Sequence, residues 1–164
     1  MDLFEIGMDS PLGKLRLIAH DQALVAVCWP DDNISIFAKQ LFTVQEDHPI
    51  LSLARHQLNE YFHKKRQYFD IPIDFVGGTP FQQAVWRALM HIPFATTWSY
   101  SDVASYLNNP LAIRAIGGTI GKNPLSIIIP CHRVIGKNGK LTGFAGGLNR
   151  KKYLLEIESI RIDV

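Results

Sequence analysis

A glycine pair near the middle of the chain, in the stretch VGGTP from Val76 to Pro80, divides the sequence into two halves of different character. Adjacent glycines are typical of a boundary, and a threonine followed by a proline is a typical helix start. Residues 1–78 carry 7 Lys and Arg against 11 Asp and Glu, a balance of −4, whereas residues 79–164 carry 10 against 4, a balance of +6. We therefore expect two domains, residues 1–76 and residues 79–164.

The charge asymmetry suggests that the basic half meets a polyanion such as nucleic acid. The hydrophobic fraction of 47% and the charged fraction of 20% are those of a soluble globular protein. No apolar run approaches the ~18 residues that span a bilayer, and the acidic start lacks the order of a signal peptide. We therefore expect a cytoplasmic protein without a membrane partner, in which Cys28 and Cys131 form no structural disulfide.

The first half has an α/β pattern. Residues 12–19 alternate between apolar and polar side chains, as a half-buried strand does, and residues 23–29 form a second strand of the same hairpin. Three aspartate and asparagine residues offer N-caps for a helix over residues 34–42. Apolar residues at helical spacing predict a helix over residues 51–62, and residues 71–75 predict a further strand.

The second half is mostly helical. It predicts a helix over residues 81–92, a short helix over residues 100–107 capped by Ser99, and a third helix over residues 111–120. The last two have the spacing of a helix-turn-helix. An Asn-Gly hairpin turn at residues 137–140 would add a wing, and a helix over residues 149–158 closes the chain.

The third helix has two contrasting faces. At 100° per residue, Ile113, Ile116 and Ile120 fall on one stripe, which we expect to face the core. The opposite face carries Leu111, Arg114, Ala115 and Gly118. Small residues let a helix backbone approach another surface closely. That surface is either a nucleic-acid backbone or another helix or subunit.

One cysteine lies in a chemically suggestive setting, in the stretch IIIPCHRV after an expected apolar strand. A thiolate is the reactive form of cysteine, and its formation needs a base or a positive neighbour. His132 and Arg133 follow Cys131 directly. A histidine base needs an orienting carboxylate, and the second half offers Asp102, Glu156, Glu158 and Asp163. The alternative is a buried structural cysteine beside a hydrogen-bonded histidine.

The surrounding motifs decide between these alternatives. The chain closely resembles the O6-alkylguanine-DNA alkyltransferases of the bacterial constitutive type along its whole length, in SPLG, GGTPFQQAVWRAL, SYSDVA, NPLAIRAIGGTIGKNP, IIIPCHRVIG, TGFAGG and RKKYLLEIE. The resemblance implies an α+β protein with a small ribonuclease-H-like α/β domain followed by a mostly helical domain with a winged helix-turn-helix. It implies a single-turnover transferase that flips O6-alkylguanine, and also O4-alkylthymine, out of duplex DNA and moves the alkyl group irreversibly to a cysteine.

The resemblance also implies catalytic roles. Cys131 matches the cysteine that accepts the alkyl group, and His132 the histidine that deprotonates it through a water. Glu158 matches the glutamate that holds this histidine. Asn123 matches the asparagine that hydrogen-bonds the backbone around the site.

Further positions match DNA contacts. Arg114 matches the arginine that fills the space of the flipped base, and Tyr100 the tyrosine that helps to turn the nucleotide out. Contacts to the DNA backbone fall on Gln82, Ser101, Asn109 and Lys137. The walls of the base pocket fall on Ile120, Val134, Phe144, Ala145 and Gly146.

The sequence departs from the family pattern at Phe144, where a tyrosine is common, and at Ser126, where the mammalian enzyme has a proline. Only His20 falls at a position of the zinc site of some relatives, so we expect no metal and no cofactor. We expect a monomer. The alternatives are a non-catalytic protein that binds alkyl lesions, a plain winged-helix DNA-binding protein, and a cysteine hydrolase.

Overall fold

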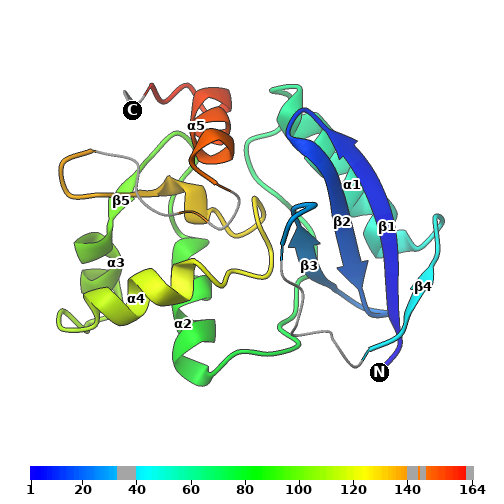
Figure 1. Cartoon of the computed structure of the whole chain (residues 1–164), viewed down its shortest axis with the longest axis horizontal. Coiled ribbons are helices and arrows are strands. Elements are labelled where there is room, and N and C mark those ends of the chain that lie inside the picture. Colours follow the sequence, from blue (N-terminus) through cyan, green and yellow to red (C-terminus); the bar gives the residue numbers. More distant parts are fainter. Residues whose placement is uncertain (33–39, 140–143, 145–146, 162–164) are drawn as a thin grey trace. The chain divides into compact units, whose positions relative to one another are not determined.

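The computed structural model of the chain describes residues 1–32, 40–139, 144 and 147–161. It divides into two compact units, Met1–Gly77 and Gly78–Val164 (Figure 1). The division falls between the two glycines at which the sequence analysis placed a boundary. In the described ranges, no helix is both long and apolar enough to cross a membrane.

The first unit contains a four-stranded sheet in the order β3-β2-β1-β4. Its strands are β1 Leu3–Ser10, β2 Gly13–Ala19, β3 Leu24–Cys28 and β4 Phe42–Val44. The first three are antiparallel neighbours, whereas β4 runs parallel to β1. Gly13, paired with Ser10, has a φ of 115°, a conformation that glycine adopts without strain at the turn between β1 and β2.

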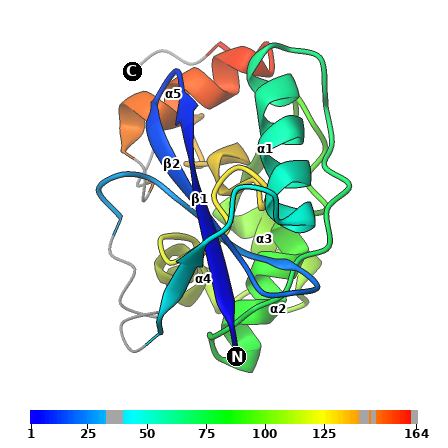
Figure 2. The same ribbon diagram turned by 90° about the vertical axis from the view of Figure 1, so that its right-hand side faces the viewer.

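Helix α1, Pro49–Phe62, packs against this sheet (Figure 2). It buries Leu51, Ala54 and Leu58 completely. Its first turn is capped by His48, whose imidazole accepts hydrogen bonds from two backbone N–H groups. The predicted helix over residues 51–62 and the predicted hairpin of β2 and β3 are therefore confirmed.

The structure differs from the predictions for the first half in three places. β1 was not predicted. Most of the helix predicted over residues 34–42 lies outside the described residues, and its last residue, Phe42, belongs to β4. The strand predicted over residues 71–75 is reduced to a single bridge between Leu24 and Ile73. Pro72 has no backbone N–H group, so it cannot donate a hydrogen bond that would extend the strand pairing. Its carbonyl oxygen accepts a hydrogen bond from Leu24 N at 2.8 Å.

The second unit begins with helices α2 Pro80–Leu89, α3 Tyr100–Tyr106 and α4 Ile113–Ile120. Helix α4 packs against both α2 and α3, as Figure 1 shows. Capping boxes start the first two: Thr79 and Gln82 exchange side-chain-to-backbone hydrogen bonds at α2, and Ser99 and Asp102 do so at α3. These predicted helix starts are confirmed.

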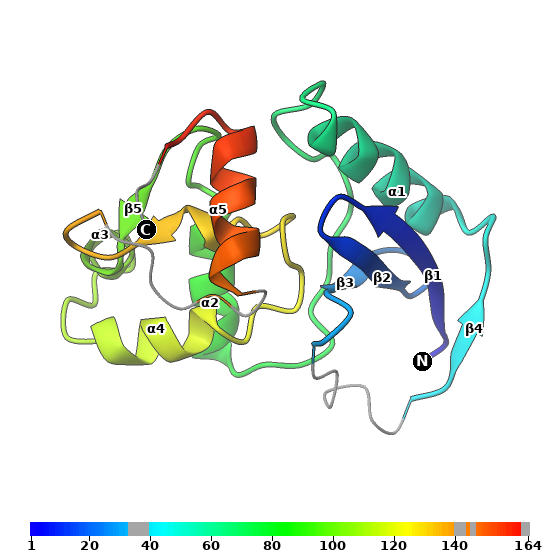
Figure 3. The same ribbon diagram turned by 45° about the horizontal axis from the view of Figure 1, so that its top comes forward.

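The remaining elements surround the predicted cysteine site. A 3-10 turn, η2 Cys131–Arg133, leads into the two-residue strand β6 Val134–Ile135, which pairs in parallel with β5 Trp98–Ser99. Helix α5, Leu148–Ile157, packs beside η2 (Figure 3). The predicted Asn-Gly turn is present, with Gly139 at a φ of 72° donating to Gly136 O, but the return strand of the predicted wing lies outside the described residues.

Two further predictions were wrong. Cys131 does not end an apolar strand. Ile127 has a φ of 73° and Pro130 lacks an N–H group, so residues 126–129 form one isolated bridge and no strand. Ile113 does not face the core: it is 41% exposed, because α4 begins there rather than at Leu111. A side chain at the first helical position leans back past the helix end, where the core does not cover it.

Candidate functional site

The thiol of Cys131 is held in a buried position by Asn123. Only 1% of Cys131 is exposed, and its backbone N–H donates to Ile129 O at 2.7 Å. Asn123 Nδ2 donates both to Cys131 Sγ at 3.0 Å and to Ile129 O at 2.9 Å. Asn123 Oδ1 accepts from Leu125 N at 2.9 Å, which fixes the orientation of the amide. A fixed donor aimed at sulfur stabilises the thiolate more than the thiol.

The next residue, His132, is joined to Glu158 at the C-cap of α5. Its Nε2 lies 2.6 Å from Glu158 Oε2, and both side chains are fully buried. Burial lowers the pKa of His132, although the hydrogen bond and the charge of Glu158 act in the opposite direction. The neutral imidazole is the form that can accept a proton.

Arg133, which the sequence analysis offered as a positive neighbour of the thiol, binds the carboxylate of Glu158 instead. Its Nε and Nη2 donate to Glu158 Oε1 and Oε2 at 2.7 and 3.1 Å, and its Nη1 donates to Ile92 O at 2.7 Å. Ala95 N adds a fourth hydrogen bond to Glu158 at 3.1 Å. Burial alone would raise the pKa of Glu158, but the hydrogen bonds and charges of His132 and Arg133 outweigh it and lower the pKa to about 2.

Lys151 in α5 is a residue of the site that the sequence analysis missed. Only 1% of it is exposed, and its Nζ donates to Val134 O at 2.5 Å. Burial lowers its pKa to about 8, while the charge of Cys131 acts to raise it. The same attraction between the ammonium group and the sulfur favours the thiolate form of Cys131. The sequence feature that could have drawn attention to Lys151 is its position in the basic run Arg150–Lys152, but the side chains of such runs are usually exposed to solvent.

The exposed face of α4 carries the residues that the sequence analysis expected there. Arg114, Ala115 and Gly118 are exposed, whereas Ile116 and Ile120 are buried. Trp86 Nε1 donates to Thr119 O at 3.0 Å and so ties α4 to α2. A Cβ on Gly118 would meet no atom within 4 Å, so packing within the described chain does not require a glycine there.

The other predicted DNA contacts differ in their surroundings. Ser101, Asn109 and Lys137 are exposed. Gln82 is half-buried, and its side-chain oxygen accepts from Thr79 N at 3.0 Å in the capping box of α2. Tyr100, at the first position of α3, is half-buried near Gly117, where an added Cβ would lie 3.9 Å from its ring.

The predicted base pocket is only partly covered by the structure. Ile120 and Val134 are buried, at 3% and 0% exposure, and Phe144 is half-buried. Ala145 and Gly146 lie outside the described residues. The backbone N–H of Gly147 donates to Phe144 O at 2.9 Å.

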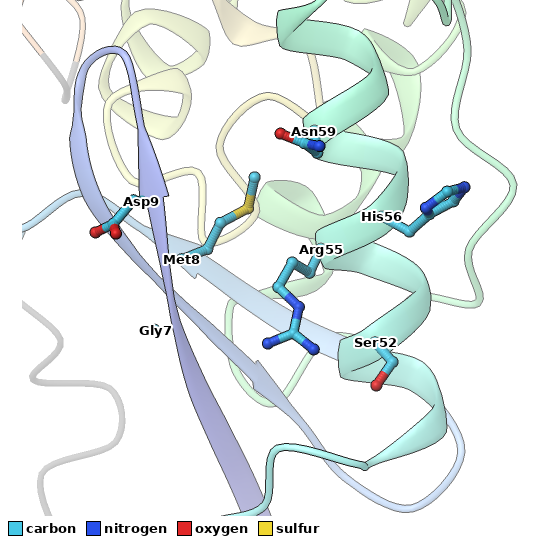
Figure 4. Close-up of a pocket in the computed structure, with 7 residues that line it drawn as sticks. All are labelled: Gly7, Met8, Asp9, Ser52, Arg55, His56 and Asn59. Carbon is cyan, nitrogen blue, oxygen red and sulfur yellow. The ribbon is translucent and has the colours of Figure 1, made fainter.

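A cavity of about 520 Å³ lies in the first unit, between β1 and α1 (Figure 4). Ser52, Arg55, His56 and Asn59 of α1 line one side of it, and residues 7–9 of β1 line the other. None of the residues that line this cavity is a cysteine, and the site around Cys131 lies in the second unit. In the part of the chain that the structure describes, no three His, Cys, Asp or Glu side chains are grouped as metal ligands.

Two family models match the chain. The ribonuclease-like domain of 6-O-methylguanine DNA methyltransferase matches residues 3–75, and the DNA binding domain of the same family matches residues 80–160. Together with the solved relatives below, these matches confirm the predicted α+β fold class.

Characterised relatives carry the same description. The methylated-DNA–protein-cysteine methyltransferase of Mycobacterium tuberculosis is 43% identical over 94% of this chain and 91% of its own length. The constitutive enzyme of Bacillus subtilis is 41% identical, over 93% of each chain. A crystal structure of the M. tuberculosis protein in complex with DNA superimposes with a TM-score of 0.87 at 42% identity, covering 95% of this chain and 93% of that one.

Proposed function

This chain belongs to the 6-O-methylguanine DNA methyltransferase family, and we propose that it repairs DNA by moving an alkyl group from the O6 atom of guanine to Cys131. The observation that carries this assignment of the acceptor is an amide donor to the sulfur beside a buried histidine–carboxylate pair. Asn123 donates to Sγ, and the neighbouring His132 is held by a buried carboxylate. A structural cysteine needs neither feature.

The reaction begins with the removal of the thiol proton. His132, neutral because it is buried, accepts this proton through a bridging water, and Glu158 stabilises the imidazolium that forms. The ion pair with Arg133 keeps the carboxylate charged for this task. Asn123 and Lys151 stabilise the resulting thiolate by a hydrogen bond and by charge.

The thiolate then displaces guanine from the alkyl carbon. A sulfur–carbon bond forms, the carbon–oxygen bond breaks, and its electron pair leaves on the base, which takes up a proton as it becomes ordinary guanine. The product at Cys131 is a thioether, which water does not hydrolyse. One protein molecule therefore repairs one lesion.

The alkylated base must leave the helical stack to reach a buried thiol. Arg114, exposed on α4 beside small residues, fills the space that the base leaves, and Tyr100 helps to turn the nucleotide out. Gln82, Ser101, Asn109 and Lys137 contact the phosphate backbone in this proposal. O4-alkylthymine presents the same bond to the thiolate and is a second substrate. The cytoplasm is the proposed location, since its reducing conditions keep Cys131 a thiol.

The test is incubation with a DNA duplex that carries one O6-methylguanine, followed by peptide mass mapping. We expect one added methylene mass on the peptide that contains Cys131, no change on the peptide that contains Cys28, and guanine in the DNA. A protein that only binds lesions would leave both the peptides and the lesion unchanged. Cys131→Ala is the matched control, and methyl loss from DNA with this variant would refute the assignment.

A further inference from the structure

A turn beside the candidate site contains an unusual backbone conformation. Thr96 N donates to Pro93 O at 3.2 Å, so residues 93–96 form a β-turn between α2 and β5. Ala95, the third residue of this turn, has a φ of 60°, whereas the second residue does not have a positive φ. A positive φ at the third position alone is that of a type II turn, in which glycine is free of strain and alanine is not.

The reason for this conformation lies in the backbone of Ala95 and not in its side chain. The residue is exposed, so packing of its methyl group does not hold the turn in place. Its N–H, however, donates to Glu158 Oε1 at 3.1 Å, across 63 positions of the sequence. In a type I turn the central peptide group is reversed, and the same N–H would point away from the carboxylate. Strained backbone of this kind persists where the surrounding structure fixes it, typically at functional sites.

The same turn also contacts the arginine that binds this carboxylate. Ile92 O accepts from Arg133 Nη1 at 2.7 Å, and the guanidinium carbon lies 5.8 Å from the centroid of the Phe94 ring. Arg133 Nε donates to Glu158 Oε1 at 2.7 Å, and this is the oxygen that also accepts from the turn. Two donors on Oε1 restrict the rotation of the carboxylate, and Oε2 stays 2.6 Å from His132 Nε2.

We propose that Ala95 is a positioning residue for alkyl transfer: its left-handed backbone keeps the N–H on Glu158 and so orients the imidazole of His132 that takes up the thiol proton. This inference rests on the proposed function. The charged groups that face His132 are Glu158, Arg133 and Lys151. A carboxylate that has lost one donor attracts a proton onto the imidazole more strongly. Loss of the Ala95 hydrogen bond therefore favours the protonated His132, which cannot accept the thiol proton.

The experiment measures the single-turnover rate of transfer from a duplex that carries one O6-methylguanine. Ala95→Val should slow transfer roughly tenfold at pH 7, because a β-branched side chain disfavours the left-handed conformation and the hydrogen bond to Glu158 is lost. The loss should be larger at pH 6 than at pH 8, since a higher pH removes the proton from His132. Ala95→Gly keeps both the N–H group and the turn, so its rate should equal the parent's at every pH.

Lys64→Val is the matched control for the strain itself. Lys64 is exposed in the first unit and has the same φ of 60°, so valine there strains the backbone equally in the unit that lacks Cys131. Both valine variants should lose similar thermal stability, and both should bind the duplex as the parent does. Only Ala95→Val should lose transfer rate, at a temperature where circular dichroism shows both variants to be folded.

Three results would overturn the inference. The first is a rate for Ala95→Val that equals the parent's at pH 6. The second is equal slowing in Lys64→Val, which would make the effect one of general stability. The third is a loss of the same size at pH 6 and pH 8, which would separate it from the protonation of His132. If the parent protein itself transfers no alkyl group, the proposed function fails before Ala95 is considered.

Discussion

His132 Nε2 lies 2.6 Å from Glu158 Oε2, with both side chains removed from solvent, and Arg133 donates to both oxygens of the same carboxylate. The single negative charge of Glu158 is therefore in contact with two groups that can carry a positive charge, Arg133 and His132. Because Arg133 already balances that charge, His132 can remain neutral without leaving a buried carboxylate uncompensated. A histidine that is held firmly but not charged is suited to receive a proton from the neighbouring thiol.

Replacing Glu158 should reveal how much the fold depends on this carboxylate. Glu158→Gln keeps the shape but leaves Arg133 buried without its counter-charge, so the free energy of unfolding should fall by about 3 kcal/mol or more. Urea unfolding at pH 7 measures this. Glu156→Gln is the control, since Glu156 is exposed on the same helix and its carboxylate lies 4.0 Å from Lys152 Nζ. A change of under 1 kcal/mol for Glu158→Gln would contradict the ion-pair account.

Acid should weaken the folded state through the same group. The folded pKa of Glu158 is about 2 against an ordinary 4.5, so the unfolded chain binds the proton more readily. The resulting stabilisation is complete above pH 4.5 and is lost as the pH falls toward 2. Between pH 4.5 and pH 2 the free energy of unfolding should fall less in Glu158→Gln than in the parent, by about 3 kcal/mol. An unchanged acid profile in the variant would show that other carboxyl groups dominate acid unfolding.

Replacing Gly118 by alanine should raise the stability of the protein and weaken its binding to DNA. A Cβ there meets nothing within 4 Å, so Gly118→Ala should stabilise the protein by about 1 kcal/mol through helix propensity. In the proposed complex the same methyl group would stand between α4 and the DNA, so duplex binding should weaken while transfer from free O6-benzylguanine is kept. Chemical denaturation and DNA titration measure the two effects. Gly117→Ala, whose Cβ would lie 3.9 Å from the ring of Tyr100, is the comparison. A variant that is more stable and binds DNA as before would show that α4 does not approach DNA closely at this point.

The elements that could be predicted from the sequence are those set by short-range interactions. The capping boxes of Thr79 with Gln82 and of Ser99 with Asp102 span three residues each, and both helix starts were predicted. Strand β4 depends instead on a parallel partner about forty residues earlier in the chain, which no local pattern reveals. The cysteine segment failed as a strand because Ile127 adopts a left-handed conformation that β-branched residues normally avoid.

The candidate site shows the same limit. Cys131, His132, Glu158 and Asn123 were predicted through the family resemblance. The structure joins their side chains in two hydrogen-bonded pairs, Asn123 with Cys131 and His132 with Glu158, at adjacent positions Cys131 and His132 of the chain. Lys151 and the pairing of Arg133 with Glu158 were missed, since arginine and lysine are normally solvated and only tertiary packing decides that these two are buried.

Cys28 should be the inert cysteine of the pair. It lies in the core of the first unit beside Leu3, Ile18 and Val25, and burial raises its pKa to about 12. At pH 8 the native protein should therefore take up one equivalent of a small alkylating reagent, on Cys131, and a second only when it is unfolded. Mass spectrometry of the two peptides checks this. In the unfolded chain the Cys28 thiol ionises near its ordinary pKa of 9, well below its pKa in the folded protein. The free energy of unfolding should therefore fall as the pH rises above 9, and Cys28→Ala should remove that fall.

Lys151 should control the pH range in which the thiol reacts. Lys151→Met keeps an unbranched chain but removes the ammonium group that favours the Cys131 thiolate. Transfer from free O6-benzylguanine should then be slower at pH 7 and should recover at higher pH, where the thiol ionises without help from the ammonium group. Lys152→Met, at the adjacent and more exposed position, is the control.

Stability supplies the second readout for the same lysine. The folded pKa of Lys151 is about 8 and its ordinary value is 10.5, so between these values the unfolded chain holds the extra proton. The contribution of Lys151 to the free energy of unfolding therefore rises with pH across this window, and Lys151→Met should abolish that rise. If the variant loses the rise in stability but keeps the parent's pH–rate profile, Lys151 serves only to anchor Val134 O. If both change together, the buried ammonium acts on the thiol as well as on the fold.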